Sequence, residues 1–240
     1  MLIKLNEQQK QLIEEHTLKC YPNEMCGFLT TDSFIPLVNK AKDTEKSFSI
    51  SALDTARYFS DIIAIVHSHT RELKRQEIFD LRTPSYADFI NQKKLPFPWL
   101  IVGCEGITVT DPLQFPRVPS QEYIGRRFQW FVNDCYSLVQ DFYRFELGII
   151  LQDAVITADY EDIRDISGIF LPYIQEYGFI EVKLEEIQEG DLILLDNSGK
   201  VDNHLGIYTN GKILHQDMIS CIVPFETFLG RIKKVLRYEQ

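Results

Sequence analysis

Two histidines separated by one residue stand at the end of a short apolar run. The run from Ile62 to Val66 is mostly β-branched, which is typical of a buried strand. Because side chains alternate along a strand, His67 and His69 point to the same side. Two imidazoles placed in this way can bind one metal ion as neighbouring ligands. The alternative is a strand end that carries two partly exposed histidines.

A catalytic metal site also needs a third ligand and an acid/base group, and the sequence offers candidates for both. Ser85 and Asp88 follow at S-x-x-D spacing, and Glu24 stands upstream, just before an apolar segment. Ser85 is a good helix N-cap, which would put Asp88 in the first turn. This order of residues favours a metal site over two unrelated histidines.

A cysteine and two further histidines form a second candidate constellation. Asp134 is an N-cap candidate, so Cys135 begins a helix that runs to about Leu147 and ends at Gly148. The positive end of the helix dipole should lower the pKa of the Cys135 thiol. A buried free cysteine that only packs in the core is the alternative.

The two histidines of this set belong to a predicted hairpin. Asn210-Gly211 is a strong signal for a two-residue type I′ turn. With that turn, Gly206 pairs with His215, and alternation places His204 on the same face as His215. The geometry predicts a triad in which Cys135 is the nucleophile, His204 the base and His215 the group that orients it. Two histidines on a solvated sheet face, or a second metal site with Cys135, are the alternatives.

The remaining pattern predicts two domains. The first half interleaves predicted helices and strands, including a helix from Asn6 to Cys20 and a hairpin that joins Trp99–Val102 to Ile107–Thr110. Residues 111–122 contain three prolines and no periodicity, so we predict a linker there between domains at 1–110 and 123–240.

Composition limits the classes of protein. The chain has 240 residues and a formal net charge of −10, which argues against nucleic acid as the main ligand. No apolar run approaches the length of a transmembrane segment, and the N-terminus lacks a signal-peptide pattern, so we expect synthesis and folding in a cytoplasm. The five cysteines lack C-x-x-C spacing, which favours reduced thiols.

The first constellation, Glu24, His67-x-His69 and Ser85-x-x-Asp88, resembles the JAMM (Mov34/MPN) metallopeptidase motif. The resemblance implies an α/β domain that holds one Zn²⁺ on His67, His69 and Asp88, with Glu24 as general base and Ser85 at the oxyanion. This chain departs from the family by a longer, charged segment after His69. The family spacing would instead fall on Glu77 and Asp80, which we consider the weaker pair.

The second constellation resembles the NlpC/P60 family, papain-like cysteine peptidases that cut peptidoglycan stem peptides. The order Asp134-Cys135, then Asn203-His204-x-Gly-Ile-Tyr, then Leu214-His215 carries this resemblance, which covers residues from Tyr123 onward. It implies an α+β papain-like fold for the second domain.

The two domains in this order resemble the tail tip assembly protein K family of lambda-like siphophages. Supporting segments include Asn23–Phe28, Leu95–Leu100 and Gly125–Phe128. The resemblance implies other tail tip proteins as partners and peptidoglycan as substrate. It implies a location in the host cytoplasm during assembly, then at the virion tail tip, and action in the host cell envelope during infection.

Three other interpretations remain open at this point. The chain is alternatively a structural tail-tip component with one or both peptidase sites inactive, or a bacterial cell-wall endopeptidase outside any phage. A deubiquitinase-like activity is possible for the first domain, but it leaves the second unexplained.

Overall fold

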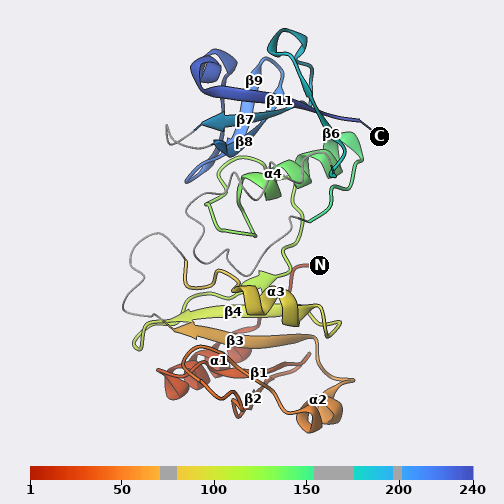
Figure 1. The fold of residues 1–240 in the computed structure, drawn as a ribbon. Coiled ribbons are helices and arrows are strands. Elements are labelled where there is room, and N and C mark those ends of the chain that lie inside the picture. The colour runs from red at the N-terminus through yellow and green to blue at the C-terminus, as the bar shows by residue number, and fades with distance from the viewer. Residues whose placement is uncertain (71–79, 154–175, 197–201, 240) are drawn as a thin grey trace. The chain divides into compact units, whose positions relative to one another are not determined.

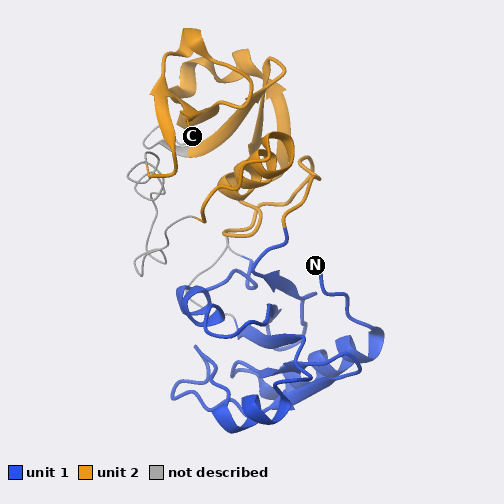
Figure 2. Cartoon of the chain, turned by 90° about the vertical axis from the view of Figure 1, so that its right-hand side faces the viewer, with its two compact units in different colours: residues 1–118 blue, residues 119–240 orange. Residues whose placement is uncertain are grey.

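The computed structural model describes residues 1–70, 80–153, 176–196 and 202–239. Its chain divides into two compact units, Met1–Val118 and Pro119–Gln240 (Figure 2). The division falls inside the segment 111–122 that the sequence predicts as a linker.

A five-stranded sheet with the strand order β2-β1-β3-β4-β5 organises the first unit (Figure 1). Strands β3 and β4 run parallel, and the other neighbours are antiparallel. The elements of this unit are α1 (Glu7–Cys20), β1 (Cys26–Leu29), β2 (Phe34–Leu37), α2 (Ala52–Tyr58), β3 (Ala64–Thr70), α3 (Tyr86–Gln92), β4 (Trp99–Cys104) and β5 (Leu113–Phe115).

Alternation along the central strands gives the sheet two buried faces. Leu29 and Val66 pack with Ile13 of α1 on one face. Phe28 and Ile65 belong to a separate apolar cluster on the other face. Strand β3 is therefore held on both sides, which fixes the direction of the side chains that follow Val66.

The helix starts predicted at Asn6 and Ser85 are confirmed, and a further helix of this unit also begins at a side-chain cap. Asn6 caps α1 in a reciprocal capping box with Gln9, and Ser51 caps α2. Ser85 caps α3 in a second capping box, with Asp88 as its partner. Local side-chain hydrogen bonds to free amides thus set where each helix begins.

The predicted hairpin after β4 is wrong in part. Residues 107–110 form no strand, and only Val109 makes an isolated antiparallel bridge, to Cys104. The antiparallel neighbour of β4 is β5, which lies within the predicted linker. Pro112 and Pro116 stand just outside this short strand, where their missing N–H groups cost no ladder hydrogen bond. The prolines therefore bound a strand instead of marking a free linker.

A six-stranded sheet with the order β10-β9-β8-β7-β11-β6 organises the second unit. All its paired neighbours are antiparallel. Its strands are β6 (Phe179–Val182), β7 (Leu192–Asp196), β8 (Asp202–Thr209), β9 (Lys212–Gln216), β10 (Ser220–Pro224) and β11 (Ile232–Tyr238), and its helices are α4 (Cys135–Phe142), a π-helical turn (Tyr143–Leu147) and 3-10 turns (Leu184–Glu186, Phe225–Arg231).

Helix α4 packs on β8 and β9 and begins as predicted (Figure 1). The Asp134 carboxylate accepts a hydrogen bond from the backbone N–H of Ser137 at 2.7 Å. The helix continues through the π-helical turn to Gly148, whose φ of 70° closes it in the left-handed region. The predicted Asn210-Gly211 turn is also confirmed, since these residues have φ values of 51° and 71°.

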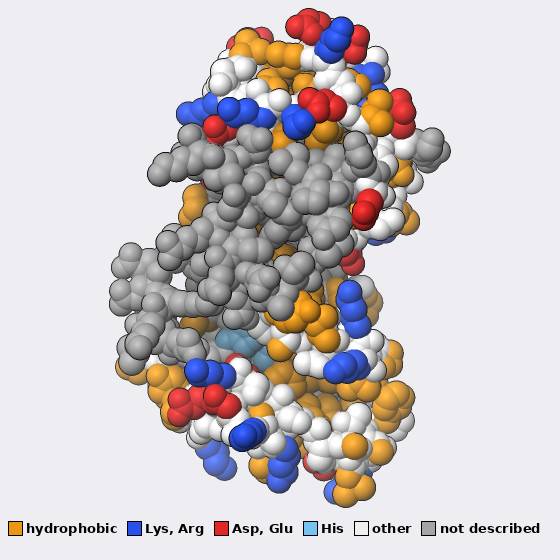
Figure 3. Space-filling model, viewed as in Figure 1, with side chains coloured by type: hydrophobic (Ala, Val, Ile, Leu, Met, Phe, Trp, Pro, Cys, Tyr) orange, Lys and Arg blue, Asp and Glu red, His pale blue; other side chains and the backbone are white. Residues whose placement is uncertain are grey.

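Among the described residues visible in Figure 3, charged side chains of both signs are interspersed. Among the helices that the structure describes, none combines the length and hydrophobicity needed to cross a membrane.

Candidate functional sites

Three side chains converge on one point in the first unit. Nε2 of His67 lies 3.1 Å from Nε2 of His69. The two Asp88 carboxylate oxygens lie 3.3 Å from His67 Nε2 and 3.2 Å from His69 Nε2. His67 and Asp88 are buried, and His69 is partly exposed. The structure thus brings together the three residues that the sequence predicts as metal ligands.

Two elements position this cluster. The histidines end β3, on the face that also carries Ile65, and Asp88 lies in the first turn of α3. The backbone N–H of Ser85 donates to Asp88 Oδ2 at 2.7 Å, and the N–H of Asp88 donates to Ser85 Oγ. The capping box therefore fixes the carboxylate as well as the helix start.

The donor set and the proton positions fit a zinc ion. Nδ1 of His69 lies 2.8 Å from the Leu81 carbonyl oxygen, which can only accept, so this nitrogen carries a hydrogen. Burial lowers the pKa of His69, but the hydrogen bond and charge of Asp88 outweigh burial and raise it to about 8. His69 thus holds a proton between Nε2 and the Asp88 carboxylate, where a cation would replace it. Two imidazole nitrogens and one carboxylate are ligands that zinc accepts in open, three-ligand sites.

Glu24 lies at the same end of the sheet. Cys26 pairs with His67 in the register of β1 and β3. The backbone N–H of Ser68 donates to the Met25 carbonyl oxygen, and Ser68 Oγ accepts a hydrogen bond from the Met25 N–H. Continuing this register places Glu24 opposite His69. Burial raises the pKa of Glu24 to about 7, so the carboxyl group is poised to exchange a proton near neutral pH.

Asp80, the described member of the alternative acidic pair, is engaged by a neighbouring arginine. Asp80 binds Arg82, whose Nε lies 2.8 Å from Asp80 Oδ1. Glu77 lies outside the described residues. Of the two candidates for the third ligand, the structure therefore places Asp88 at the histidines.

The second candidate site begins at Cys135, the first residue of α4. Its side chain is buried and belongs to the same apolar cluster as Leu205, the residue that follows His204. The prediction of a lowered pKa is wrong. Burial, with a smaller contribution from the charge of Asp134, raises the pKa of the Cys135 thiol to about 12, and nearby backbone N–H groups oppose this shift only in part. The thiol is therefore neutral at rest, and a base must take its proton before it can attack.

The predicted hairpin brings the two histidines of this site together. Gly206 pairs with His215, Ile207 with Leu214 and Thr209 with Lys212, as the turn predicts. Nε2 of His204 lies 3.0 Å from Nδ1 of His215, and both side chains are buried.

Burial and, to a smaller extent, the neighbouring His215 together lower the pKa of His204 to about 4. Burial also lowers the pKa of His215. Both imidazoles are therefore neutral at pH 7, which is the state in which His204 can accept a proton.

One residue at this site was missed by sequence analysis. Sγ of Cys221, in β10, lies 3.3 Å from Nε2 of His215, and the two residues are opposite each other in the β9–β10 ladder. Extending the strand alternation beyond the hairpin was the signal that would have found it.

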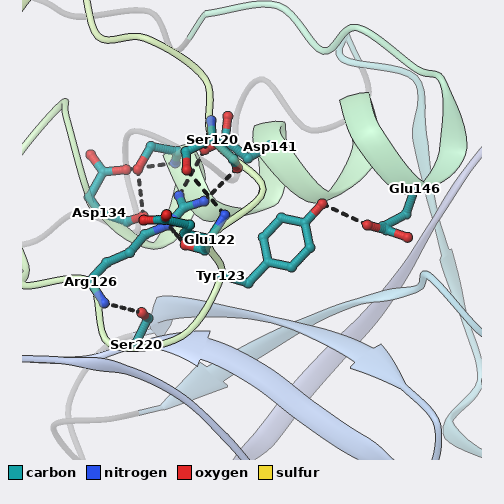
Figure 4. Close-up of polar contacts among 9 residues, drawn as sticks. Ser120, Glu122, Tyr123, Arg126, Asp134, Asp141, Glu146 and Ser220 are labelled. Atoms are coloured by element: carbon teal, nitrogen blue, oxygen red, sulfur yellow. Dashed lines mark hydrogen bonds and ion pairs between the residues drawn. The ribbon is translucent and has the colours of Figure 1, made fainter. Parts of the chain in front are cut away.

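A buried ion pair holds the segment that leads into Cys135. Arg126 Nη1 donates to Asp141 Oδ2 of α4 at 2.8 Å, and the side chains are 7% and 1% exposed (Figure 4). The same guanidinium donates to the carbonyl oxygens of Ser120 and Glu122. Its backbone N–H donates to Ser220 Oγ of β10 at 2.8 Å. Arg126 thus ties the start of the unit to α4 and to the edge of the sheet.

Comparison with known proteins defines the class of the second unit. The model of the NlpC/P60 family matches residues 123–230, so this unit is a papain-like domain of the cysteine peptidase and hydrolase type. A solved NLP/P60 family protein from Staphylococcus aureus, described as similar to lipoprotein, is 21% identical with a TM-score of 0.34, over 50% of this chain and 38% of that one. A protein from Desulfitobacterium hafniense is 19% identical with a TM-score of 0.31, over 45% of this chain and 80% of that one.

Similarity to two phage proteins extends over more of the chain. Tail tip assembly protein K of Escherichia phage lambda is 33% identical over 156 residues, which cover 65% of this chain and 69% of the lambda protein. Tail tip assembly protein K of Escherichia phage N15 is 26% identical over 240 residues, which cover 95% and 93% of the two chains. The chain belongs to the tail tip assembly protein K family.

Replacing Arg126 by Met should destabilise the second unit, because Asp141 would keep a buried charge without this partner. Breaking a buried pair in this way costs roughly 3 kcal/mol, or about a hundredfold in the exchange rate of amides that open with the unit. Hydrogen exchange of the α4 amides in the whole protein measures this. The neighbouring exposed residue gives the control, since Arg127→Met should leave exchange unchanged. Equal exchange in both variants would show that the ion pair does not hold α4.

Proposed function

We propose that this chain is a phage tail-tip protein whose second unit hydrolyses peptide bonds in the stem peptides of peptidoglycan. Cys135 is the nucleophile, His204 the base and His215 the residue that orients His204. The observation that carries the proposal is the 3.0 Å contact between His204 Nε2 and His215 Nδ1, on the strands β8 and β9 against which the Cys135 helix α4 packs. The family match over residues 123–230 and the two phage relatives support it.

The reaction follows from the neutral state of the thiol and the imidazole. Nδ1 of His204 takes the Cys135 proton, and the sulfur attacks the carbonyl carbon of the substrate. The amides at the start of α4 stabilise the negative oxygen of the tetrahedral intermediate. The C–N bond then breaks, and the amine leaves with the proton from His204. His204 finally removes a proton from water, which hydrolyses the thioester and restores the thiol.

The substrate class follows the resemblance to NlpC/P60 peptidases. We propose the bond between D-Glu and the diamino acid of the stem peptide. The protein would meet this bond in the host cell envelope during infection, after assembly in the host cytoplasm with other tail-tip proteins.

Digestion of purified peptidoglycan tests this proposal. The whole protein should release stem-peptide fragments, and Cys135→Ala should lower the rate to background, because the proposed nucleophile is removed. Cys104→Ala, at a buried cysteine of the first unit, is the control and should keep full activity. Product masses identify the bond. Fragments released equally by the Cys135 variant would contradict the proposal, and no release by the unmutated protein would favour the structural alternative.

We propose as a second function that the first unit is a metal-dependent peptidase of the JAMM type. His67, His69 and Asp88 would hold one Zn²⁺ ion. When bound, zinc would supply a Lewis acid that makes water a stronger nucleophile near neutral pH. Glu24, whose pKa of about 7 suits proton exchange, would take a proton from water. Ser85 Oγ accepts a hydrogen bond from the backbone N–H of Asp88. The hydroxyl hydrogen of Ser85 would then donate to a substrate oxygen.

Metal analysis tests the zinc site. Whole protein purified in zinc-containing buffer should hold about one equivalent of zinc, the content of a single three-ligand site. His67→Ala should lose it, because only two ligands would remain. His16, which contacts Cys20 on α1 and lies outside the cluster, provides the control variant His16→Ala. Unmutated protein without zinc, or equal zinc content in His67→Ala and His16→Ala, would contradict the zinc site.

A further inference from the structure

Cys221, His215 and His204 form a chain of three side chains in which His215 contacts both of the others. Its sulfur lies 3.3 Å from His215 Nε2, while the other ring nitrogen of His215 lies 3.0 Å from His204 Nε2. The three side chains come from the neighbouring strands β8, β9 and β10. His204 and His215 are buried, and Cys221 is partly exposed.

The two contacts of His215 are coupled through its single hydrogen. A neutral imidazole carries one N–H and one unprotonated nitrogen. If Nε2–H of His204 donates to His215 Nδ1, then His215 must carry its hydrogen on Nε2. The Cys221 sulfur is then the acceptor of that hydrogen.

The opposite arrangement has a different chemical result. If the Cys221 S–H donates to His215 Nε2, then Nδ1–H of His215 donates to His204 Nε2. The hydrogen of a neutral His204 would then sit on Nδ1, and that nitrogen would be unable to take a proton from a thiol. The role of the Cys221 sulfur, acceptor or donor, therefore selects between a competent and an incompetent His204 base.

We propose that Cys221 is a positioning residue that accepts the Nε2 hydrogen of His215 and so holds His204 with its unprotonated nitrogen at Nδ1. Two features of the site support this role. An imidazole N–H is a stronger donor than a thiol S–H, which favours sulfur as the acceptor. The Phe228 ring packs edge-on against the His215 ring, with ring centroids 5.1 Å apart, and restrains the plane of that ring.

Among the described residues, Asp217 is a charged group whose field reaches His204, His215 and Cys221. It raises the pKa of both histidines, but burial outweighs it, so the pair stays neutral at pH 7. Hydrogen-bond direction, instead of charge, therefore distinguishes the two states of the site at this pH.

The assignment of a role in hydrolysis rests on the proposed function, but the tautomer can be measured without it. Nitrogen NMR of ¹⁵N-histidine-labelled whole protein at neutral pH reports which ring nitrogen carries the hydrogen. We expect His204 to be protonated at Nε2 and His215 at Nε2. In Cys221→Ala, where the acceptor is lost, both rings should show a mixture of tautomers. Protonation of His204 at Nδ1 in the unmutated protein would overturn the proposal.

Hydrolysis kinetics give a second readout. Cys221→Ala should lower kcat about five- to tenfold with little change in KM, which is the population change that one neutral hydrogen bond brings. Cys221→Ser keeps an acceptor and should restore most of the rate. Val223→Ala truncates a side chain two residues along β10 that packs in an apolar cluster, and it should leave kcat unchanged.

A pH profile separates positioning from packing. The acidic limb of kcat/KM for the unmutated protein should lie near the His204 pKa of about 4. Cys221→Asp places a carboxylate at the end of the chain, favours the imidazolium and should move that limb to higher pH. An unmoved limb, together with full activity of Cys221→Ala, would overturn the proposal.

The experiments distinguish failure of the proposed hydrolysis from failure of the positioning role of Cys221. If the unmutated protein releases no fragments but the tautomers respond to Cys221→Ala, the hydrogen-bond chain is correct and peptidoglycan hydrolysis is not. If release survives in Cys135→Ala but is lost in Cys221→Ala, then Cys221 is itself the nucleophile with His215 as its base, which overturns the positioning role.

Discussion

The register of the β8–β9 hairpin is the constraint on which the chemistry of the second unit depends. Asn210 and Gly211 both adopt positive φ, which fixes a two-residue turn and thereby pairs Gly206 with His215. A slip of one residue would move one histidine to the opposite face of the sheet. The hairpin also requires glycine at position 206, because a Cβ atom there would lie 2.5 Å from the Ile213 side chain.

The first unit solves a similar problem with a strand and a helix start. Burial of both faces of β3 fixes the alternation that aims His67 and His69 to one side. The capping box of α3 then fixes Asp88, whose Oδ2 accepts the N–H of Ser85 and also lies 3.2 Å from His69 Nε2. The same carboxylate therefore starts a helix and completes a three-ligand cluster. Changes to the cap would affect both.

Short-range sequence patterns predict much of the fold and of both candidate sites. The caps at Asn6, Ser85 and Asp134 and the Asn210-Gly211 turn depend on residues within a few positions of each other, so the sequence predicts them well. Longer-range effects were not predictable in this way.

Three long-range effects make the structure differ from the sequence prediction. Strand β5 forms because β4 offers it an edge, although its flanking prolines resemble a linker. The raised pKa of Cys135 comes from burial, which overrides the local helix dipole. The contact of Cys221 with His215 depends on a third strand and on the path of the chain between β9 and β10.

In the proposed reaction the Cys135 sulfur attacks the substrate carbonyl with His204 as its base. The most direct measurement is to mix the whole protein briefly with peptidoglycan, quench with acid and locate covalent adducts by peptide mass spectrometry. We expect a stem-peptide acyl group on Cys135. An acyl group on Cys221 or another side chain, with Cys135 unmodified, would contradict it.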